Sequence, residues 1–467
     1  MSARVRPGWT FAVTSLALFM VTLDNLVVTT ALPVIRTDLS TTLGGLEWTV
    51  NAYTLTFAVL LLTGAALGDR FGRKRVFGIG VAVFVLGSAA AALAPSTAAL
   101  VAARAVQGLG GAIVTPLTLT ILSAATPPQK RAAALGAWSG IGGLAVALGP
   151  LIGGTIVDSL SWQWIFWLNV PVGLLLSALA RVVLAESYGP SRRLDVPGLG
   201  LASTGLFGIV WALIRGYEVG WGTAQITLAL LAGTALLVAL VAWERRAPAP
   251  MLPMRFFRSR AFVLTNVAAL LMFFGMFGAI FLFVQFFQTA QGYSPIRAGL
   301  MFLPWTAMPI FIAPVAGGMS GRIGNSRIMA IGLALQAVAL AWIAAVLSPN
   351  VSYSLLVAPF VLAGAGMAHF FAPVANVVLS SVRPEEEGQA SGANNAIREL
   401  GGVLGVAALA AVFTANGGYG SATSFVDGLR PAMWAAAAIV AVAVGAALAI
   451  PRFTATDTSP AAETPAT

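Results

Sequence analysis

The sequence has no cysteine and a single histidine, His369. Disulfide bonds, thiol catalysis, haem attachment and zinc clusters therefore cannot form the basis of its function. Lysine occurs only twice, as Lys74 and Lys130, and neither residue ends a G-x-x-x-x-G-K-S/T loop that would bind ATP phosphates. We therefore expect no metal, no cofactor and no P-loop nucleotide site.

Charged residues are also scarce, at 9% of 467 residues, whereas 58% are apolar and the mean hydropathy is +0.89. A soluble domain carries roughly 25% charged residues, so this chain could not cover its own surface in water. Apolar stretches recur along its whole length, and each is close to the ~20 residues that a bilayer-spanning helix needs. The composition predicts an all-α polytopic membrane protein.

Fourteen transmembrane helices can be placed on the chain, with boundaries uncertain by about three residues. The first apolar stretch is too long for the core of a cleaved signal peptide, so we expect it to stay as the first span. The fourteen predicted spans are 10–34, 48–68, 76–94, 98–122, 133–157, 164–185, 196–215, 222–243, 262–288, 297–320, 328–347, 352–380, 389–414 and 431–450.

Arginine and lysine are distributed unevenly over the two membrane sides that these spans define. Of the 26 basic residues, two lie within spans and only four lie on the side opposite the N-terminus. This positive-inside bias predicts a multi-pass protein of the cell membrane with both termini in the cytoplasm. It also explains the net charge of +10 without a nucleic-acid partner. The Ala/Gly/Arg-rich composition indicates a high-GC bacterial gene.

The two halves of the chain share short patterns at an offset of about 252 to 256 residues. Arg70, Gly72 and Arg75 recur as Arg322, Gly324 and Arg327, and Gly136 and Gly149 recur as Gly392 and Gly405. Parallel repeats of six helices are one way in which secondary transporters are built. We predict six-helix bundles at 10–185 and 262–450, a two-helix insert with cytoplasmic linkers at 186–261, a cytoplasmic N-terminus at 1–9 and a disordered cytoplasmic tail at 451–467.

Five short motifs follow one another along the first half: LDNLVVTTALP, GAALGDRFGRKR, RAVQGLGGA, GPLIGG and SWQWIFWLNVPVG. In this order and at these spans they resemble the major facilitator superfamily, specifically its fourteen-span drug:proton antiporter family. Ala65, Gln163 and Thr29–Thr30 depart from the usual pattern. The resemblance implies the major facilitator fold and proton-coupled efflux of lipophilic, often cationic, compounds by alternating access between the two membrane sides.

Asp24 lies near the middle of the first span, where an ionised carboxylate costs roughly 2.5–3.5 kcal/mol. Arg104 lies about two turns inside the fourth span, which neighbours the first in the family fold, so it could reach Asp24. Burial favours the neutral acid and a nearby guanidinium favours the charged one. We interpret Asp24 and Arg104 as a proton-coupling pair, with a fixed structural ion pair as the alternative.

A polar and aromatic stripe on the ninth span is a candidate substrate surface. Phe277, Phe281, Gln285 and Gln288 share one helical face, which suits a promiscuous apolar ligand, although such residues also serve as core or lipid-facing side chains. The full set of predicted substrate-binding residues is Asp24, Tyr53, Phe277, Phe281, Gln285, Gln288, Asn376 and Asn394.

Three groups of residues are candidates for conformational gating. The first group lies in the loop after the second predicted span. The resemblance implies that it forms a latch across the halves that stabilises the outward-open state; an ordinary basic loop is the alternative. The small residues of GPLIGG allow close helix contact. Two adjacent charges in span 13 have either a packing or a coupling role. These groups are Asp69, Arg70, Gly72 and Arg73; Gly149, Pro150, Gly153 and Gly154; and Arg398 and Glu399.

The leading hypothesis is a monomeric secondary transporter, not an enzyme, whose partners are protons, a small-molecule substrate and the lipid bilayer. An alternative is a dedicated exporter of one antibiotic or metabolite made by the same cell. A non-transporting receptor or a membrane enzyme is a third class. Either would need a sizeable soluble domain or a concentrated catalytic set, and the sequence has neither.

Overall fold

The computed structural model of the chain describes residues 7–189, 194–383 and 386–451. Throughout these ranges every regular element is a helix. Fourteen helical segments among them are long and apolar enough to cross a bilayer. The predicted class, an all-α polytopic membrane protein with fourteen spans, is therefore confirmed.

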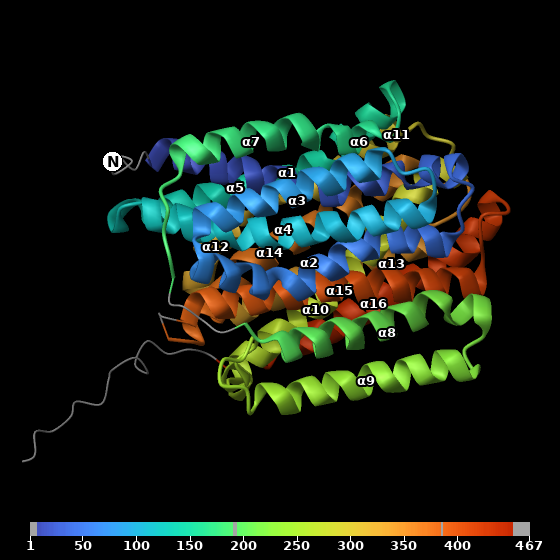
Figure 1. The fold of residues 1–467 in the computed structure, drawn as a ribbon. Helices are drawn as coiled ribbons and strands as arrows, with labels where there is room; N and C mark the ends of the chain where they lie inside the picture. Colours follow the sequence, from blue (N-terminus) through green and yellow to red (C-terminus); the bar gives the residue numbers. More distant parts are fainter. Residues whose placement is uncertain (1–6, 190–193, 384–385, 452–467) are drawn as a thin grey trace, which may run out of the picture.

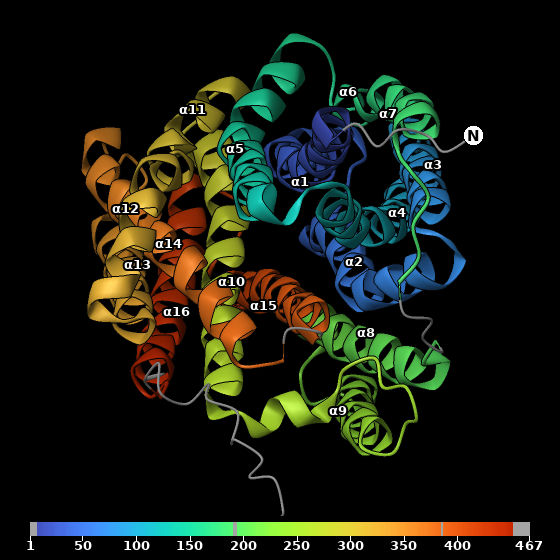
Figure 2. The same ribbon diagram turned by 90° about the vertical axis from the view of Figure 1, so that its left-hand side faces the viewer.

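The helices form two bundles and a separate pair, which Figure 2 shows nearly end-on. The first bundle contains α1 (Pro7–Asp38), α2 (Leu43–Phe71), α3 (Arg73–Ala92), α4 (Thr97–Ala125), α5 (Pro128–Ser159), α6 (Trp164–Trp167) and α7 (Asn169–Val183). The pair is α8 (Val196–Val219) and α9 (Ala224–Glu244). The second bundle contains α10 (Arg260–Gln285), α11 (Pro295–Thr306), α12 (Met308–Ile323), α13 (Asn325–Val346), α14 (Tyr353–Ser380), α15 (Glu387–Asn416) and α16 (Ala422–Leu448).

The two ends of the molecule differ in what they hold. Figure 1 shows α1 beginning at the left, and the even number of spans returns α16 to the same end. We call the end with Pro7 and Pro451 the terminal end, and the opposite one the far end. The predicted tail at 452–467 and part of the linker at 190–193 lie outside the described residues. The predicted N-terminal segment is shortened, because Pro7 already begins α1.

Several helix boundaries differ from the prediction because proline and capping residues act locally. The span predicted at 297–320 is divided at Ala307, just before Pro309, which has no N–H to continue the helical ladder. The span predicted at 431–450 begins earlier, at Ala422, where the Ser421 hydroxyl accepts a hydrogen bond from Ser424 N. The span at 164–185 is divided at Leu168 into α6 and α7.

The insert lies beside the bundles, against α2 and α15 (Figure 2). Its inner helix α8 packs Leu206 and Val210 against Leu55 of α2 and Val403 of α15. Its outer helix α9 is largely uncovered, because only 11% of its most apolar stretch is buried. The buried share is 72% for the span Arg260–Ala290, which begins with α10. After α9, residues 245–259 return to the bundles through the 3-10 turn η1 (Met254–Arg258).

Candidate functional site

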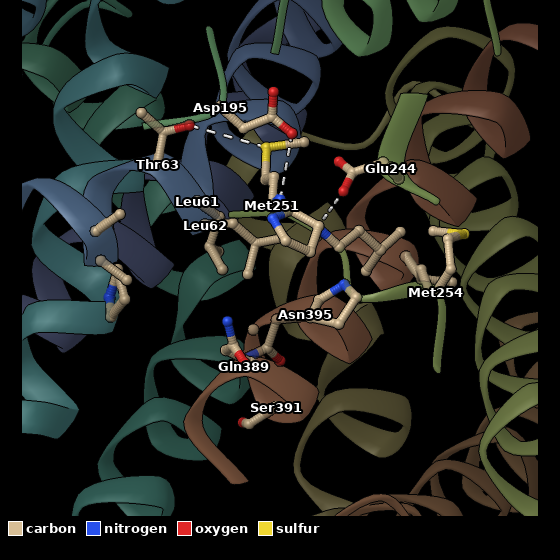
Figure 3. A pocket seen from close by; sticks show the side chains of 18 of the residues that line it. Leu61, Leu62, Thr63, Asp195, Glu244, Met251, Met254, Gln389, Ser391 and Asn395 are labelled. Atoms are coloured by element: carbon tan, nitrogen blue, oxygen red, sulfur yellow. Dashed lines mark hydrogen bonds between the residues drawn. The ribbon is translucent and has the colours of Figure 1, made fainter. Parts of the chain in front are cut away.

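A cavity of about 1720 Å³ lies in the terminal half of the molecule, between the two bundles and the insert. Its wall is mostly apolar and comes from α2, α4, α10, α15 and the 245–258 segment (Figure 3). Ligand pockets usually measure about 300–1,000 Å³, so this one has room for large or varied small molecules. Polar groups in the wall include Asn266, Gln389, Ser391 and Asn395.

The predicted substrate-binding residues do not line this cavity in the observed conformation. The Asn394 amide, which is 6% exposed, donates to Asn266 Oδ1 at 3.0 Å and so reaches the wall indirectly. Asn376 is exposed on α14. Tyr53 is 1% exposed and lies under the Arg104 guanidinium, 4.2 Å from the ring centroid. Their roles in substrate binding stay predictions.

The predicted stripe instead runs along α10 and, through Gln288, into the π-helical turn η2 (Phe286–Ala290) at the far end. Phe277 packs on Gly402, and Phe281 is buried at 1% exposure. Gln285 is fully buried and accepts a hydrogen bond from the Tyr419 hydroxyl. Gln288 Nε2 donates to the Thr30 carbonyl oxygen of α1 at 2.8 Å, which joins the two bundles. In this conformation the stripe helps to close the far end.

Asp24 and Arg104 form a buried ion pair, as their positions in spans 1 and 4 indicated. Arg104 Nη1 lies 2.6 Å from Asp24 Oδ2, and the two residues are 0% and 3% exposed. Gln107 Nε2 and Asn169 Nδ2 donate to Asp24 Oδ1 at 2.7 and 2.6 Å. Both amides also donate to the Ser88 hydroxyl. The network joins α1, α3, α4 and α7 inside the first bundle.

The partners of the Asp24 carboxyl fit its ionised form. Arg104, Gln107 and Asn169 all present N–H donors to it, and Gln107 Oε1 already accepts from Arg104. A protonated carboxyl would lose one of these acceptor positions and would leave Arg104 without its counter-charge. Adding a proton to Asp24 therefore requires the network to rearrange. Asp24 is not among the described residues that line the cavity.

Sequence reasoning did not assign a role to Gln107, Asn169 or Ser88. Gln107 stands inside RAVQGLGGA and Asn169 inside SWQWIFWLNVPVG. Both are amides in otherwise apolar spans, and that feature could have marked them as partners for the buried charges. Nothing in the sequence distinguishes Ser88 from other small residues of its span.

At the far end the bundles meet through the small residues of GPLIGG. A Cβ atom on Gly154 would lie 2.3 Å from the Pro295 carbonyl oxygen, and one on Gly299 would lie 2.2 Å from that of Pro150. Gly149 and Gly153 approach α1 in the same way. The expected close contact is therefore present, and it spans both halves of the molecule. Arg36 of α1 lies over the Tyr419 ring at 3.6 Å and covers the same end.

The loop between α2 and α3 makes its contacts within the first half. Asp69 pairs with Arg73 at 2.9 Å, and Arg70 lies over the Phe71 ring at 5.2 Å. Glu186, after α7, accepts hydrogen bonds from Lys74 N and Arg75 N at the start of α3. In the described part of the chain Asp69 has no ion pair across the halves, so the cross-half latch stays a prediction for another conformation. The sequence analysis assigned no role to Glu186.

Gly72 closes this loop with φ of +101°, and a Cβ atom there would lie 2.8 Å from the Glu186 carboxyl carbon. We expect Gly72→Ala to lower the free energy of unfolding by about 1–3 kcal/mol, because a side chain is strained at this φ. Thermal unfolding of the purified protein in detergent measures the change. Gly78→Ala, at a helical glycine with no heavy atom within 4 Å of its Cβ position, is the matched control. Equal melting temperatures for the two variants would contradict the prediction.

Arg398 and Glu399 face different surroundings, as adjacent residues on a helix must. The Arg398 guanidinium lies over Phe273 at 4.4 Å and donates to Asn395 Oδ1 at 3.1 Å. Glu399, on the next position of α15, is partly buried. Packing and coupling roles both stay open for this pair.

The two bundles, the insert and the cavity between them define a polytopic membrane transporter. Residues 14–406, and in a second match residues 265–466, agree with the Major Facilitator Superfamily. The chain belongs to this superfamily.

Curated relatives cover most of the chain. It is 37% identical over 409 residues, 87% of this chain and 76% of the relative, to the multidrug resistance protein Stp of Mycobacterium tuberculosis (strain CDC 1551 / Oshkosh). It is 36% identical to the tetracenomycin C resistance and export protein of Streptomyces glaucescens, which covers 89% of this chain and 77% of that protein. The cephamycin export protein CmcT of Amycolatopsis lactamdurans is also 36% identical, over 86% and 84% of the chains.

Solved structures share the fold. A bacterial homologue of the human lysosomal transporter Spinster, in an inward-facing and unoccupied conformation, gives a TM-score of 0.68 at 17% identity over 95% and 96% of the chains. A POT family transporter in complex with a thioalcohol-conjugated peptide gives 0.71 at 14% identity over 94% of each. At these identities the similarity concerns the fold alone.

Proposed function

We propose that this protein is a proton-coupled efflux transporter that exports lipophilic, often cationic, compounds by alternating access. The observation that carries the export direction is the 36% identity, over most of both chains, to a resistance and export protein. The large and mostly apolar cavity supports a broad range of small molecules. A second candidate, export of one self-made metabolite, is supported by the relatives from Streptomyces glaucescens and Amycolatopsis lactamdurans.

The basic residues support the orientation in which the terminal end faces the cytoplasm. The cavity then takes up substrate from the cytoplasmic side, while the α5–α11 contact keeps the far end closed. Rocking of the two bundles exposes the cavity to the outside. In that outward-open state the Asp69 loop pairs across the halves at the terminal end. Each elementary charge that crosses 100 mV supplies about 2.3 kcal/mol for this cycle.

Asp24 carries the exchanged proton in this proposal. In the conformation open at the terminal end its carboxyl accepts only from N–H donors. Protonation from outside breaks its bond to Arg104 or to one of the amides, and this changes the packing of α1 against α4 and α7. The bundle that contains Asp24 also forms one wall of the cavity, so its rearrangement acts on substrate affinity without direct contact.

The test is drug efflux by the full-length chain in a drug-sensitive bacterial host. Expression should lower the susceptibility of the cells to several lipophilic drugs, and a protonophore should abolish the effect because it removes the driving force. Everted vesicles with an imposed pH gradient report the same transport directly. Efflux that persists after the protonophore would exclude proton coupling. Transport of one metabolite and no drug would favour the second candidate.

A further inference from the structure

The two-helix insert ends in an acidic residue that faces the cavity. Glu244 is the last residue of α9, is 3% exposed and is among the residues that line the cavity. Figure 3 shows its side chain beside the 245–254 segment, with Gln389, Ser391 and Asn395 of α15 in the same cavity wall. A buried carboxylate is costly without a positive partner, so its surroundings decide what it does.

Only one of the two Glu244 carboxyl oxygens has a hydrogen-bond partner. Its Oε2 accepts a hydrogen bond from Leu252 N at 3.2 Å, whereas its Oε1 is buried and has no hydrogen-bond partner. No ion pair joins Glu244 to a basic residue in the described part of the chain. The ion pairs found there use Asp24, Asp69 and Glu386 as their acids, and none of them involves Glu244. Among the described residues, Glu244 Oε1 therefore has room for a further hydrogen-bond donor or positive group.

A second carboxyl adds negative charge here. Asp195, before α8, accepts a hydrogen bond from Met251 N, and Glu244 accepts one from the next amide, Leu252 N, so the two carboxyls lie beside the same short segment. Unlike Glu244, Asp195 is saturated: it accepts from Gly198 N at 2.8 Å, from Trp243 Nε1 at 2.7 Å and from Met251 N at 3.4 Å. It is therefore held in place, and its negative charge adds to the field at Glu244.

Two of the four arginines that line the cavity are paired with acids other than Glu244 and Asp195. Arg73 is bonded to Asp69, and Arg255 is bonded to Glu386 outside the cavity wall. Arg245 and Arg258 also line the cavity. The wall next to Glu244 is built from Met251, Leu252, Pro253 and Met254, whose apolar and thioether groups adapt to ligands of different shape. A positive charge on an apolar body matches both features.

We propose that Glu244, with Asp195 beside it, is a binding site in the cavity wall for the cationic group of a lipophilic molecule. The inference deepens the proposed export function, on which it rests for its physiological meaning. It also gives the insert a role, because α8 and α9 bring both acids and the adaptable 245–254 segment to the cavity. The cation binds Glu244 Oε1 while its apolar part lies against the methionines.

Direct binding to the purified full-length protein in detergent tests this site. The probes are tetraphenylphosphonium and tetraphenylborate, which have nearly the same size and apolar surface but opposite charge. We expect Glu244→Gln to weaken tetraphenylphosphonium binding about tenfold, because it removes one nearby charge from a poorly solvated site, and to leave tetraphenylborate binding unchanged or stronger. Glu244→Asp should retain most of the affinity for the cation.

Two controls separate the site from general effects. Asp158→Asn removes one negative charge from an exposed position near the far end of α5 and should change neither affinity. Thermal unfolding of each variant shows whether the fold is kept. Unchanged tetraphenylphosphonium affinity in Glu244→Gln, an equal loss for both probes, or no binding of the cation by the unmodified protein would each overturn the proposal. No proton gradient is present in this experiment, so its result is independent of whether export is proton-driven.

Discussion

Asp24→Asn is expected to abolish proton-driven transport in everted vesicles and to destabilise the protein. The substitution removes the carboxyl that we propose carries the proton, and it leaves Arg104, which is 0% exposed, without a counter-charge. Breaking one partner of a buried ion pair costs about 3–5 kcal/mol, which is a large part of the stability of most proteins. Vesicle uptake under an imposed pH gradient measures the first effect, and thermal unfolding in detergent measures the second.

A double variant distinguishes proton coupling from a purely structural pair. Asp24→Asn with Arg104→Gln removes both charges, so it should regain much of the stability lost by the single variant. If Asp24 carries the proton, the double variant is folded but gives no proton-driven uptake. If the pair only holds α1 against α4, the double variant transports like the unmodified protein, and the coupling role is wrong. Asp158→Asn, at an exposed acid, is the charge control.

Gly154→Leu is expected to shift the protein toward the conformation open at the far end. The Gly154 Cβ position lies 2.3 Å from the Pro295 carbonyl oxygen and 2.8 Å from Ile296 Cα, both of which are backbone atoms of the other bundle. A larger side chain cannot be accommodated while α5 and α11 remain in contact. Overpacking of this kind costs about 1–3 kcal/mol, which changes a two-state equilibrium by about 5–150-fold.

The lack of native cysteine makes this shift measurable. Ser391→Cys places one thiol in the cavity wall, where a membrane-impermeant maleimide reacts with it from the side to which the cavity opens. Labelling should occur from the terminal side in the parent chain and increase from the far side with Gly154→Leu. Gly140→Leu, on the same helix at a position with nothing within 4 Å, should leave the labelled side unchanged. Identical sidedness in all three chains would contradict the far-end gate.

The buried ion pair shows how far sequence reasoning reaches into a membrane protein. Asp24 and Arg104 are opposite charges within apolar spans, and each is costly in a bilayer unless it meets the other. That cost made the pairing predictable across 80 residues of chain. The amides Gln107 and Asn169 could not be assigned to the same carboxyl, because a neutral polar group has many acceptable partners inside a helix bundle.

The stripe on α10 shows the opposite case. The periodicity predicts Phe277, Phe281, Gln285 and Gln288 on one helical face. In the structure α10 ends at Gln285, and Gln288, in the π-helical turn that follows, bonds to Thr30 at the closed far end and not to the cavity. Whether such a face meets substrate or the other bundle depends on how the bundles are tilted. The free energies of two such arrangements of one sequence differ by only a few kcal/mol, and no short segment of the sequence determines that difference.

The number of spans, their apolar character and the repeat of two halves follow from the residues alone, because each residue's transfer free energy between water and lipid is a local property. The partners of the buried polar groups and the position of the Glu244 carboxyl in the cavity wall were decided only in three dimensions. These features depend on contacts between segments far apart in the chain, where shape and hydrogen bonding select one arrangement among many with similar hydropathy.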